Sequence, residues 1–249
     1  MISLDRQKNV AVLKLDRSTT NAINLELVET LSSALQEVKH DPRVRALVLT
    51  SANNKFFSIG FDIPELYDLD RSEFETFYRE FNNLCLDLYT LPKPVVASLN
   101  GHAIAGGCIL ALCCDYRLMA ADKKLIGLNE VKLGVPVPYL ADCILRELVG
   151  IRLARQIMET GDFYSSEQAL QVGLVDQALP LELLLPNALQ KASSLGDSPG
   201  EAFALIKQNR IESIEAQILA RWHKKQAAFI DCWYSQEARE LLKLAMDKF

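Results

Sequence analysis

The chain has 249 residues, of which 49% are apolar and 24% are charged, the balance of an ordinary globular protein. Its net charge is −5, and it has no block of lysine and arginine of the kind that follows a phosphate backbone. The composition therefore argues against a nucleic-acid partner. If a ligand carries phosphate groups, a local site must hold them, because the overall charge repels anions.

The first two-thirds of the chain alternates short β-type runs with segments whose apolar residues recur at helical spacing. In chain order we expect a strand at 9–15, a helix at 25–38, a strand at 44–49, a helix at 72–91, a strand at 95–99, a helix opening near Ala105, and strands at 116–120 and 125–126. This alternation predicts an α/β core.

From about Tyr139 the pattern becomes helical. Ser165 and Gln168 form a plausible capping box for a short helix that ends before Gly173, and residues 175–179 resemble one last strand. After Leu181 only helices are expected, the last two at 214–233 and 236–246. We therefore divide the chain into an α/β core, residues 1–190, and a helical C-terminal region, residues 191–249.

Residues 95–114 form a stretch of twenty without a formal charge, long enough to span a bilayer. Asn100-Gly101 and Gly106-Gly107 interrupt it, as a buried strand, a turn and a buried helix would require. We expect core rather than membrane.

Cysteine usage and the chain ends bear on the compartment. The cysteines are Cys85, Cys108, Cys113, Cys114, Cys143 and Cys232, and no two form a C-x-x-C pair. The first ten residues lack the features of a signal or transit peptide, and the C-terminal Asp247-Lys248-Phe249 is not a peroxisomal address. We expect reduced, buried thiols and a cytoplasmic setting, in a bacterium.

Three segments could carry chemistry, and the first runs from Lys55 to Ile63. It follows a predicted strand and a polar loop, and its Gly60 would let the backbone approach a ligand closely. The alternative is a plain turn from a loop into a helix. Ser58 lies outside any G-x-S-x-G pattern, so it is not expected to be a nucleophile.

The second segment runs from Asn100 to Ile109, where a strand ends and Gly106-Gly107 opens an apolar helix. Backbone N–H groups at a helix start are unpaired, and the helix dipole adds positive potential there. Such a site suits an anion or a developing oxyanion. The alternative is a glycine pair that serves only close packing. The pattern matches neither G-x-G-x-x-G nor a P-loop.

The third segment runs from Ile126 to Gly134 and holds one carboxylate, Glu130, among apolar residues. Burial would raise its pKa and make it a base that can also return a proton. The alternative is that Glu130 is exposed or paired with Lys132 or Arg117. No metal site is expected, because the three histidines are scattered. His102 is expected to have a structural role beside the turn, with a place in the lining of the site as the alternative.

Taken together, in this order and at these separations, the three segments resemble the crotonase (enoyl-CoA hydratase/isomerase) superfamily. The similarity runs from Val10 to about Pro180. It is strongest in Ala105-Gly106-Gly107-Cys108 and in residues 111–117. Residues 126–130 and 169–176 are most similar to the Δ3,Δ2-enoyl-CoA isomerases, the mitochondrial type in particular.

The resemblance implies a spiral of β-β-α units with a helical C-terminal region that supports trimerisation and covers the active site, in trimers or pairs of trimers. It implies that the N–H groups of Phe61 and Gly106 bind the oxygen of an acyl-CoA thioester while Glu130 faces its α-carbon. Residues expected to contact the substrate are Ile59, Gly60, Phe61, Asp62, Ile63, Gly106, Gly107, Ile109, Leu128 and Asn129. Coenzyme A is part of the substrate, and no cofactor is implied.

One departure from the family pattern bears on the reaction. Hydratases of the family use two glutamates to hold water, and this chain has Ile109 where the first belongs. A lone Glu130 can still move a proton from C2 of a 3-enoyl thioester to C4, through a dienolate that the oxyanion hole stabilises. We therefore expect an isomerase acting in fatty acid β-oxidation. Phe61 replaces a residue that is commonly small, but the donor needed there is a backbone group.

Other interpretations of the function remain open. The superfamily also hosts hydration, decarboxylation, thioester hydrolysis and dehalogenation, and a non-catalytic acyl-CoA-binding subunit is a further alternative. Phe229 and Trp233, one helical turn apart, are expected to be core residues, with the wall of an acyl pocket as the alternative.

Overall fold

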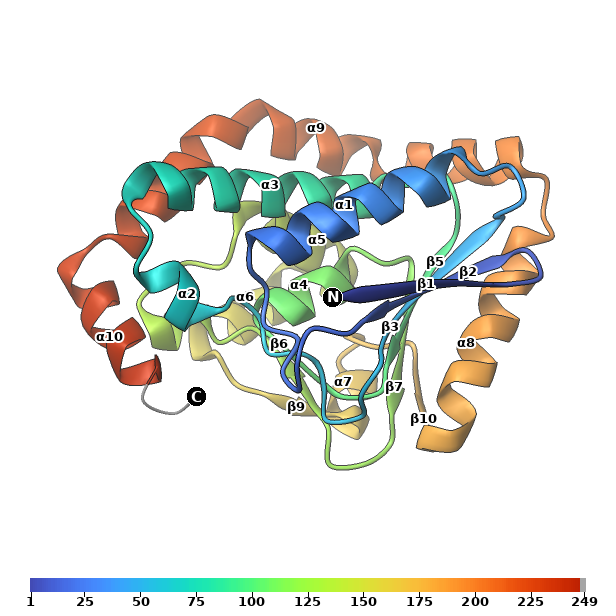
Figure 1. Cartoon of the computed structure of the whole chain (residues 1–249), viewed down its shortest axis with the longest axis horizontal. Helices are drawn as coiled ribbons and strands as arrows, with labels where there is room; N and C mark the ends of the chain where they lie inside the picture. The colour runs from blue at the N-terminus through green and yellow to red at the C-terminus, as the bar shows by residue number, and fades with distance from the viewer. Residues whose placement is uncertain (247–249) are drawn as a thin grey trace.

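A six-stranded sheet forms the frame of the molecule, which we describe from a computed structural model over residues 1–246 (Figure 1). In spatial order its strands are β1 (Ile2–Gln7), β2 (Val10–Leu15), β3 (Ala46–Ser51), β5 (Val95–Leu99), β7 (Tyr116–Ala120) and β10 (Gln177–Leu179). β1 pairs antiparallel with β2, and every other pair in this sheet is parallel. Parallel strands need long crossovers, and the helices supply them.

A smaller sheet lies beside the first. Its strands, in spatial order, are β4 (Phe56–Ser58), β6 (His102–Ile104), β8 (Leu125–Gly127) and β9 (Tyr164–Ser165). β3, β5 and β7 are each followed within a few residues by a strand of this sheet, and the chain then enters a helix or helical turn. The repeat of strand, strand and helix confirms the predicted α/β spiral.

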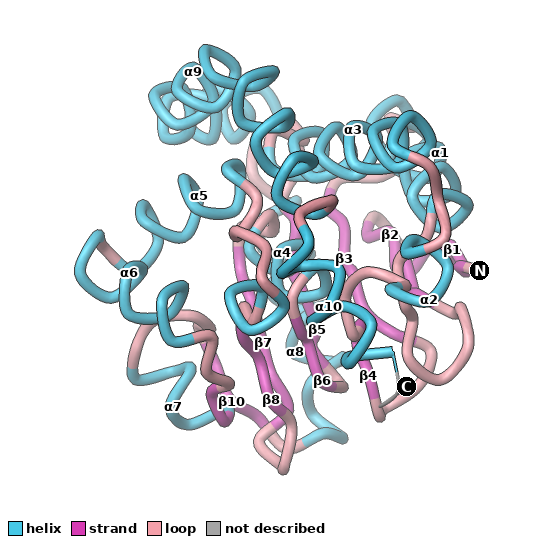
Figure 2. The backbone as a smooth tube through the Cα atoms, turned by 90° about the vertical axis from the view of Figure 1, so that its left-hand side faces the viewer, coloured by secondary structure: helices cyan, strands magenta, loops and turns pink. Residues whose placement is uncertain are grey.

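Helices cover both faces of the large sheet (Figures 1 and 2). On one face α1 (Leu25–His40) and α3 (Arg71–Tyr89) lie side by side, each started by a side-chain cap, from Asn24 and Asp70 respectively. On the other face α8 (Leu181–Gly196) buries its apolar stripe against the strands. The division predicted after residue 190 falls within α8.

The remaining helices close the structure around the small sheet. They are α2 (Ile63–Tyr67), α4 (Gly106–Leu112), α5 (Tyr139–Val149), α6 (Ile151–Thr160), α7 (Ser166–Gln171), α9 (Gly200–Trp233), α10 (Gln236–Met246) and the 3-10 turn η1 (Glu130–Leu133). α9 crosses α3 and α5, and α10 turns back against α2 and η1 (Figure 2). The capping box predicted from Ser165 and Gln168 is present at the start of α7.

The uncharged stretch 95–114 belongs to the core rather than to a membrane span, as predicted, and it folds as β5, β6 and α4, with β6 where a turn was expected. Within residues 1–246 no helix is long and apolar enough to cross a membrane. The six cysteines are free, and all but Cys232 are buried. Asp247-Lys248-Phe249 lies outside the described residues.

Candidate active site

The three predicted segments meet around one largely apolar cavity of about 570 Å³, a size suited to a small-molecule ligand. Of the residues expected to contact a substrate, six line it, together with the predicted base: Ile59, Phe61, Ile63, Gly106, Ile109, Asn129 and Glu130. Segments separated by up to seventy residues therefore come together at the site, as their joint appearance in the sequence predicted.

Four other residues expected at the substrate lie behind the wall of the cavity. Gly60, at a φ of +98°, lies behind the residues that line the cavity. The carboxylate of Asp62 points away from the cavity and binds Arg17 at 2.6 Å. Gly107 packs against β4, and Leu128 is fully buried. In this arrangement these four act through the backbone or through packing, and their direct contact with a substrate stays a prediction.

The backbone N–H of Phe61 is free to serve a ligand. Phe61 forms an isolated parallel bridge with Ile23. The two hydrogen bonds of the bridge are made by the residues on either side of Phe61: Ile23 N–H donates to the Gly60 carbonyl (2.7 Å), and Asp62 N–H donates to the Ile23 carbonyl (2.9 Å). In such a bridge the central residue's own N–H points away from the partner. Within residues 1–246 it meets no acceptor.

The second free donor is the N–H of Gly106, the first residue of α4, where a helix has no internal acceptor. The preceding Ala105 holds a φ of +47°, a conformation that costs free energy for a residue with a Cβ and is found where function requires it. A Cβ placed on Gly60 would lie 3.0 Å from the Gly106 nitrogen, so the two segments are in direct contact. Across the described chain Gly106 N–H likewise has no protein acceptor, and the pair can hold one oxygen.

Gly107, the neighbouring glycine, has a packing role. A Cβ on Gly107 would lie 2.3 Å from the carbonyl oxygen of Ser58, a distance that no real Cβ contact reaches. Both interpretations of the glycine pair therefore apply, one to each residue. Gly107 allows α4 to approach β4, and Gly106 presents its N–H to the cavity.

Glu130, at the start of η1, supplies the carboxylate that lines the cavity. Its side chain is 5% exposed, and burial raises its pKa to about 8. Among residues 1–246 its Oε2 has no hydrogen-bond partner. The alternative pairings are excluded, because Lys132 binds Asp162 at 2.9 Å and the guanidinium of Arg117 faces backbone carbonyls and Asp176.

Aromatic rings from distant helices form one wall. Phe229 stacks on Tyr78 with a centroid distance of 4.1 Å, and Trp233 stacks on Phe74 at 4.3 Å. The ring of Phe61 meets Trp233 edge-on at 6.4 Å. Phe229 and Trp233 are thus core residues, as expected, and they also line the cavity. Stacking on both sides gives the wall a fixed shape.

Several lining residues were not singled out from the sequence: Phe56, Ile104, Leu125, Lys132, Leu133, Val135, Pro138, Phe163 and Ala245. His102 also lines the cavity, and it has the expected structural role too, because its Nδ1 accepts a hydrogen bond from Leu125 N–H at 3.0 Å. Burial lowers the pKa of its imidazole, with smaller effects from nearby charges. Nδ1 as acceptor fixes the neutral ring with its proton on Nε2.

Residues 5–246 match the family model described as enoyl-CoA hydratase/isomerase. The chain belongs to this family. It is 35% identical to mouse mitochondrial enoyl-CoA delta isomerase 1 over 181 residues, which cover 72% of this chain and 63% of the mouse protein. It is 31% identical to a crotonyl-CoA hydratase of Syntrophomonas wolfei over 252 residues, covering 99% and 95% of the two chains.

The fold of this family member is very similar to that of a solved isomerase. Human mitochondrial delta3-delta2-enoyl-CoA isomerase superposes with a TM-score of 0.96 at 27% identity, covering 99% of this chain and 97% of the human one. Because isomerases and hydratases show comparable sequence identity, the reaction must be argued from the site.

Proposed function

We propose that this protein is a Δ3,Δ2-enoyl-CoA isomerase, which converts a 3-enoyl-CoA into the 2-trans-enoyl-CoA in fatty acid β-oxidation. The observation that carries the proposal is the lone buried carboxylate. Glu130 is the one carboxylate on the cavity wall among residues 1–246, and the position where a hydratase would hold its first glutamate is the apolar Ile109.

The reaction needs one base and one oxyanion site. Glu130 removes a proton from C2 of the 3-enoyl thioester, and the electrons move into a dienolate whose charge rests on the thioester oxygen. The N–H groups of Phe61 and Gly106 stabilise that charge. The protonated Glu130 then gives the same proton to C4, so that the double bond ends between C2 and C3. A carboxyl with a pKa of about 8 suits both halves of the transfer.

Coenzyme A enters as part of the substrate, and this reaction consumes no redox or metal cofactor. The apolar wall of Phe229 and Trp233 suits an acyl chain. We further propose that the chain assembles as a trimer or a pair of trimers and acts in the cytoplasm.

Hydration is the second candidate, favoured by the similarity to the crotonyl-CoA hydratase. Addition of water requires a polar group that holds the water opposite the base. The side chain of Ile109 is 1% exposed and offers no hydrogen bond. We therefore expect hydration to be weak or absent.

The test uses a short cis-3-enoyl-CoA and the matching 2-enoyl-CoA as separate substrates. The parent should form conjugated 2-enoyl thioester from the first and add little water to the second. Glu130→Gln should lose isomerisation, whereas the exposed control Glu147→Gln should retain it. Faster hydration than isomerisation would overturn the isomerase assignment. Inactivity on both substrates would also overturn it and would leave decarboxylation or thioester hydrolysis as the reactions to test next.

A further inference from the structure

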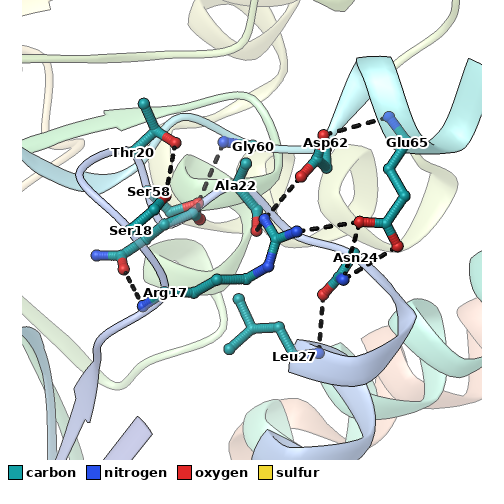
Figure 3. A network of polar contacts seen from close by, with 11 residues as sticks. Arg17, Ser18, Thr20, Ala22, Asn24, Leu27, Ser58, Gly60, Asp62 and Glu65 are labelled. Carbon is teal, nitrogen blue, oxygen red and sulfur yellow. Dashed lines mark hydrogen bonds and ion pairs between the residues drawn. The ribbon is translucent and has the colours of Figure 1, made fainter. Parts of the chain in front are cut away.

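Residues 17–24, which turn at 18–20 and form a parallel bridge to Phe61 at Ile23, lie beside the oxyanion segment, residues 58–62 (Figure 3); we call residues 17–24 the brace. Three backbone hydrogen bonds join the two: Ile59 N–H to the Thr20 carbonyl (3.0 Å), Ile23 N–H to the Gly60 carbonyl (2.7 Å) and Asp62 N–H to the Ile23 carbonyl (2.9 Å). No residue of the brace lines the cavity, whereas Ile59 and Phe61 of the oxyanion segment do.

The second of these bonds determines where the oxyanion donor points. The Gly60 carbonyl and the Phe61 N–H belong to one planar trans peptide group, so they point in opposite directions. Because Ile23 holds the carbonyl on the brace side, the N–H is directed to the cavity side. Rotation of this one peptide plane would remove the donor from the site without altering any side chain that lines it.

Gly60 is the residue about which that plane could rotate, because a glycine at a φ of +98° has more accessible conformations than any other residue would have. The hydroxyl of Ser58 restrains it. This group is fully buried; it accepts a hydrogen bond from Gly60 N–H (3.1 Å) and donates one to the Asn21 carbonyl (2.8 Å). The single hydroxyl therefore ties the glycine to the brace.

Side chains anchor the brace in turn. The guanidinium of Arg17 donates to the Ala22 carbonyl at 2.8 Å and to the carboxylate of Asp62 at 2.6 Å, and so it clamps both segments together (Figure 3). The amide of Asn21 donates to the Phe57 carbonyl at 3.0 Å, although Asn21 must hold a φ of +46° to do so. A strained backbone conformation of this kind is kept only where several surrounding contacts hold it in place.

We propose that Ser58 is a positioning residue of the oxyanion hole. Through Gly60 it fixes the peptide plane that presents the Phe61 N–H to the thioester oxygen, with the clamp of Arg17 behind it. The inference rests on the proposed function for the identity of the ligand, an acyl-CoA thioester. It assigns a role in the reaction to a polar network whose side chains neither line the cavity nor contact Glu130.

The loss of Ser58's hydroxyl should affect the transition state more than the bound substrate. A donor that is misdirected part of the time weakens a hydrogen bond that strengthens as charge develops on oxygen. Complete loss of an oxyanion donor costs about a hundredfold to a thousandfold in kcat. For Ser58→Ala, which frees the plane without deleting the donor, we expect a fall in kcat of about tenfold to a hundredfold and a change in KM below about threefold.

The chain offers a matched control. Ser98, in β5, is also fully buried, and within residues 1–246 its hydroxyl has no hydrogen-bond partner. Ser98→Ala thus removes the same atom from a similarly buried place without breaking a hydrogen bond. It should leave kcat and KM unchanged. Should Ser58→Ala fail to fold, Arg17→Met removes the clamp at a partly exposed position and should reduce kcat in the same direction.

A spectroscopic readout separates positioning from general damage and needs no turnover. An acyl-CoA whose thioester is conjugated with an aromatic ring absorbs at longer wavelength when its carbonyl is polarised. The absorption maximum of this probe should shift to longer wavelength when the probe binds the parent or Ser98→Ala. The shift should be smaller when it binds Ser58→Ala. An equal shift and equal kcat in Ser58→Ala would overturn the proposal.

The same probe distinguishes this inference from the proposed reaction. A parent that shifts the probe but does not isomerise 3-enoyl-CoA would contradict the isomerase assignment, while the loss of shift in Ser58→Ala would still support the positioning role. A parent that binds the probe without any shift would overturn the oxyanion hole and the role of Ser58 together.

Discussion

Replacing Glu130 by glutamine should make the protein more stable while it removes the base. Burial raises the pKa of Glu130 from 4.5 to about 8, so at pH 7 the folded protein keeps this carboxyl mostly protonated while the unfolded chain ionises it. Folding therefore takes up a proton, and the folded state loses stability as pH rises from about 4.5 to about 8. The difference amounts to about 3 kcal/mol at pH 7 and about 1 kcal/mol at pH 5.

Glutamine is close to the protonated carboxyl in size and does not titrate, so Glu130→Gln should avoid this cost. The advantage of the variant over the parent should shrink by about 2 kcal/mol between pH 7 and pH 5. Urea unfolding of both proteins at the two pH values, at one fixed protein concentration, measures it. The exposed Glu147→Gln should follow the parent. An advantage that stays constant or grows at pH 5, or a parent more stable than the variant at pH 7, would refute the assignment of Glu130 as a buried, proton-binding group.

Three further results are expected. Because Glu130 must be ionised to accept a proton, kcat/KM should rise about tenfold per pH unit between pH 6 and pH 7 and level off above about pH 8; a flat profile there would contradict the raised pKa. Gly107→Ala should lose both thermal stability and kcat, because its Cβ would lie 2.3 Å from a carbonyl oxygen of β4, whereas Gly200→Ala, with its nearest atom at 3.6 Å, should lose neither. Lys207→Met removes the buried ammonium 2.8 Å from Asp115, which keeps Arg210 and the Val95 N–H as partners, and should cost about 2 kcal/mol in urea unfolding; a cost below about 0.5 kcal/mol would mean that the pair does not hold α9 to the sheet.

The sequence was most informative where chemistry and local pattern coincide. A carboxylate amid apolar residues and a glycine pair after a strand made Glu130 and Gly106 candidates, the resemblance to the crotonase superfamily assigned both to the site, and the structure brings both to the cavity. The long strands β2, β3, β5 and β7 were also foreseen, because their apolar runs are long enough to show a pattern. The three-residue strands β8 and β10 were foreseen as well, at 125–126 and 175–179, whereas β4 and β6 lie where turns were expected.

What the sequence did not reveal depends on contacts between distant segments. The resemblance placed Asp62 at the substrate as part of residues 59–63, and in the structure its carboxylate binds Arg17, forty-five positions earlier. Neither Arg17 nor Asn21 has a local pattern that connects it with the oxyanion segment. The same holds for Ala245, which α10 brings to the cavity from near the end of the chain.

The central claim is that Glu130 alone carries a proton from C2 to C4, and the fate of that proton tests it most directly. A 3-enoyl-CoA with two deuterium atoms at C2 is converted in ordinary water, and the product is examined by mass spectrometry. Transfer by a single buried carboxylate predicts product that retains both labels, one at C2 and one at C4. Product with one label only, its C4 hydrogen drawn from water in every molecule, would contradict the account.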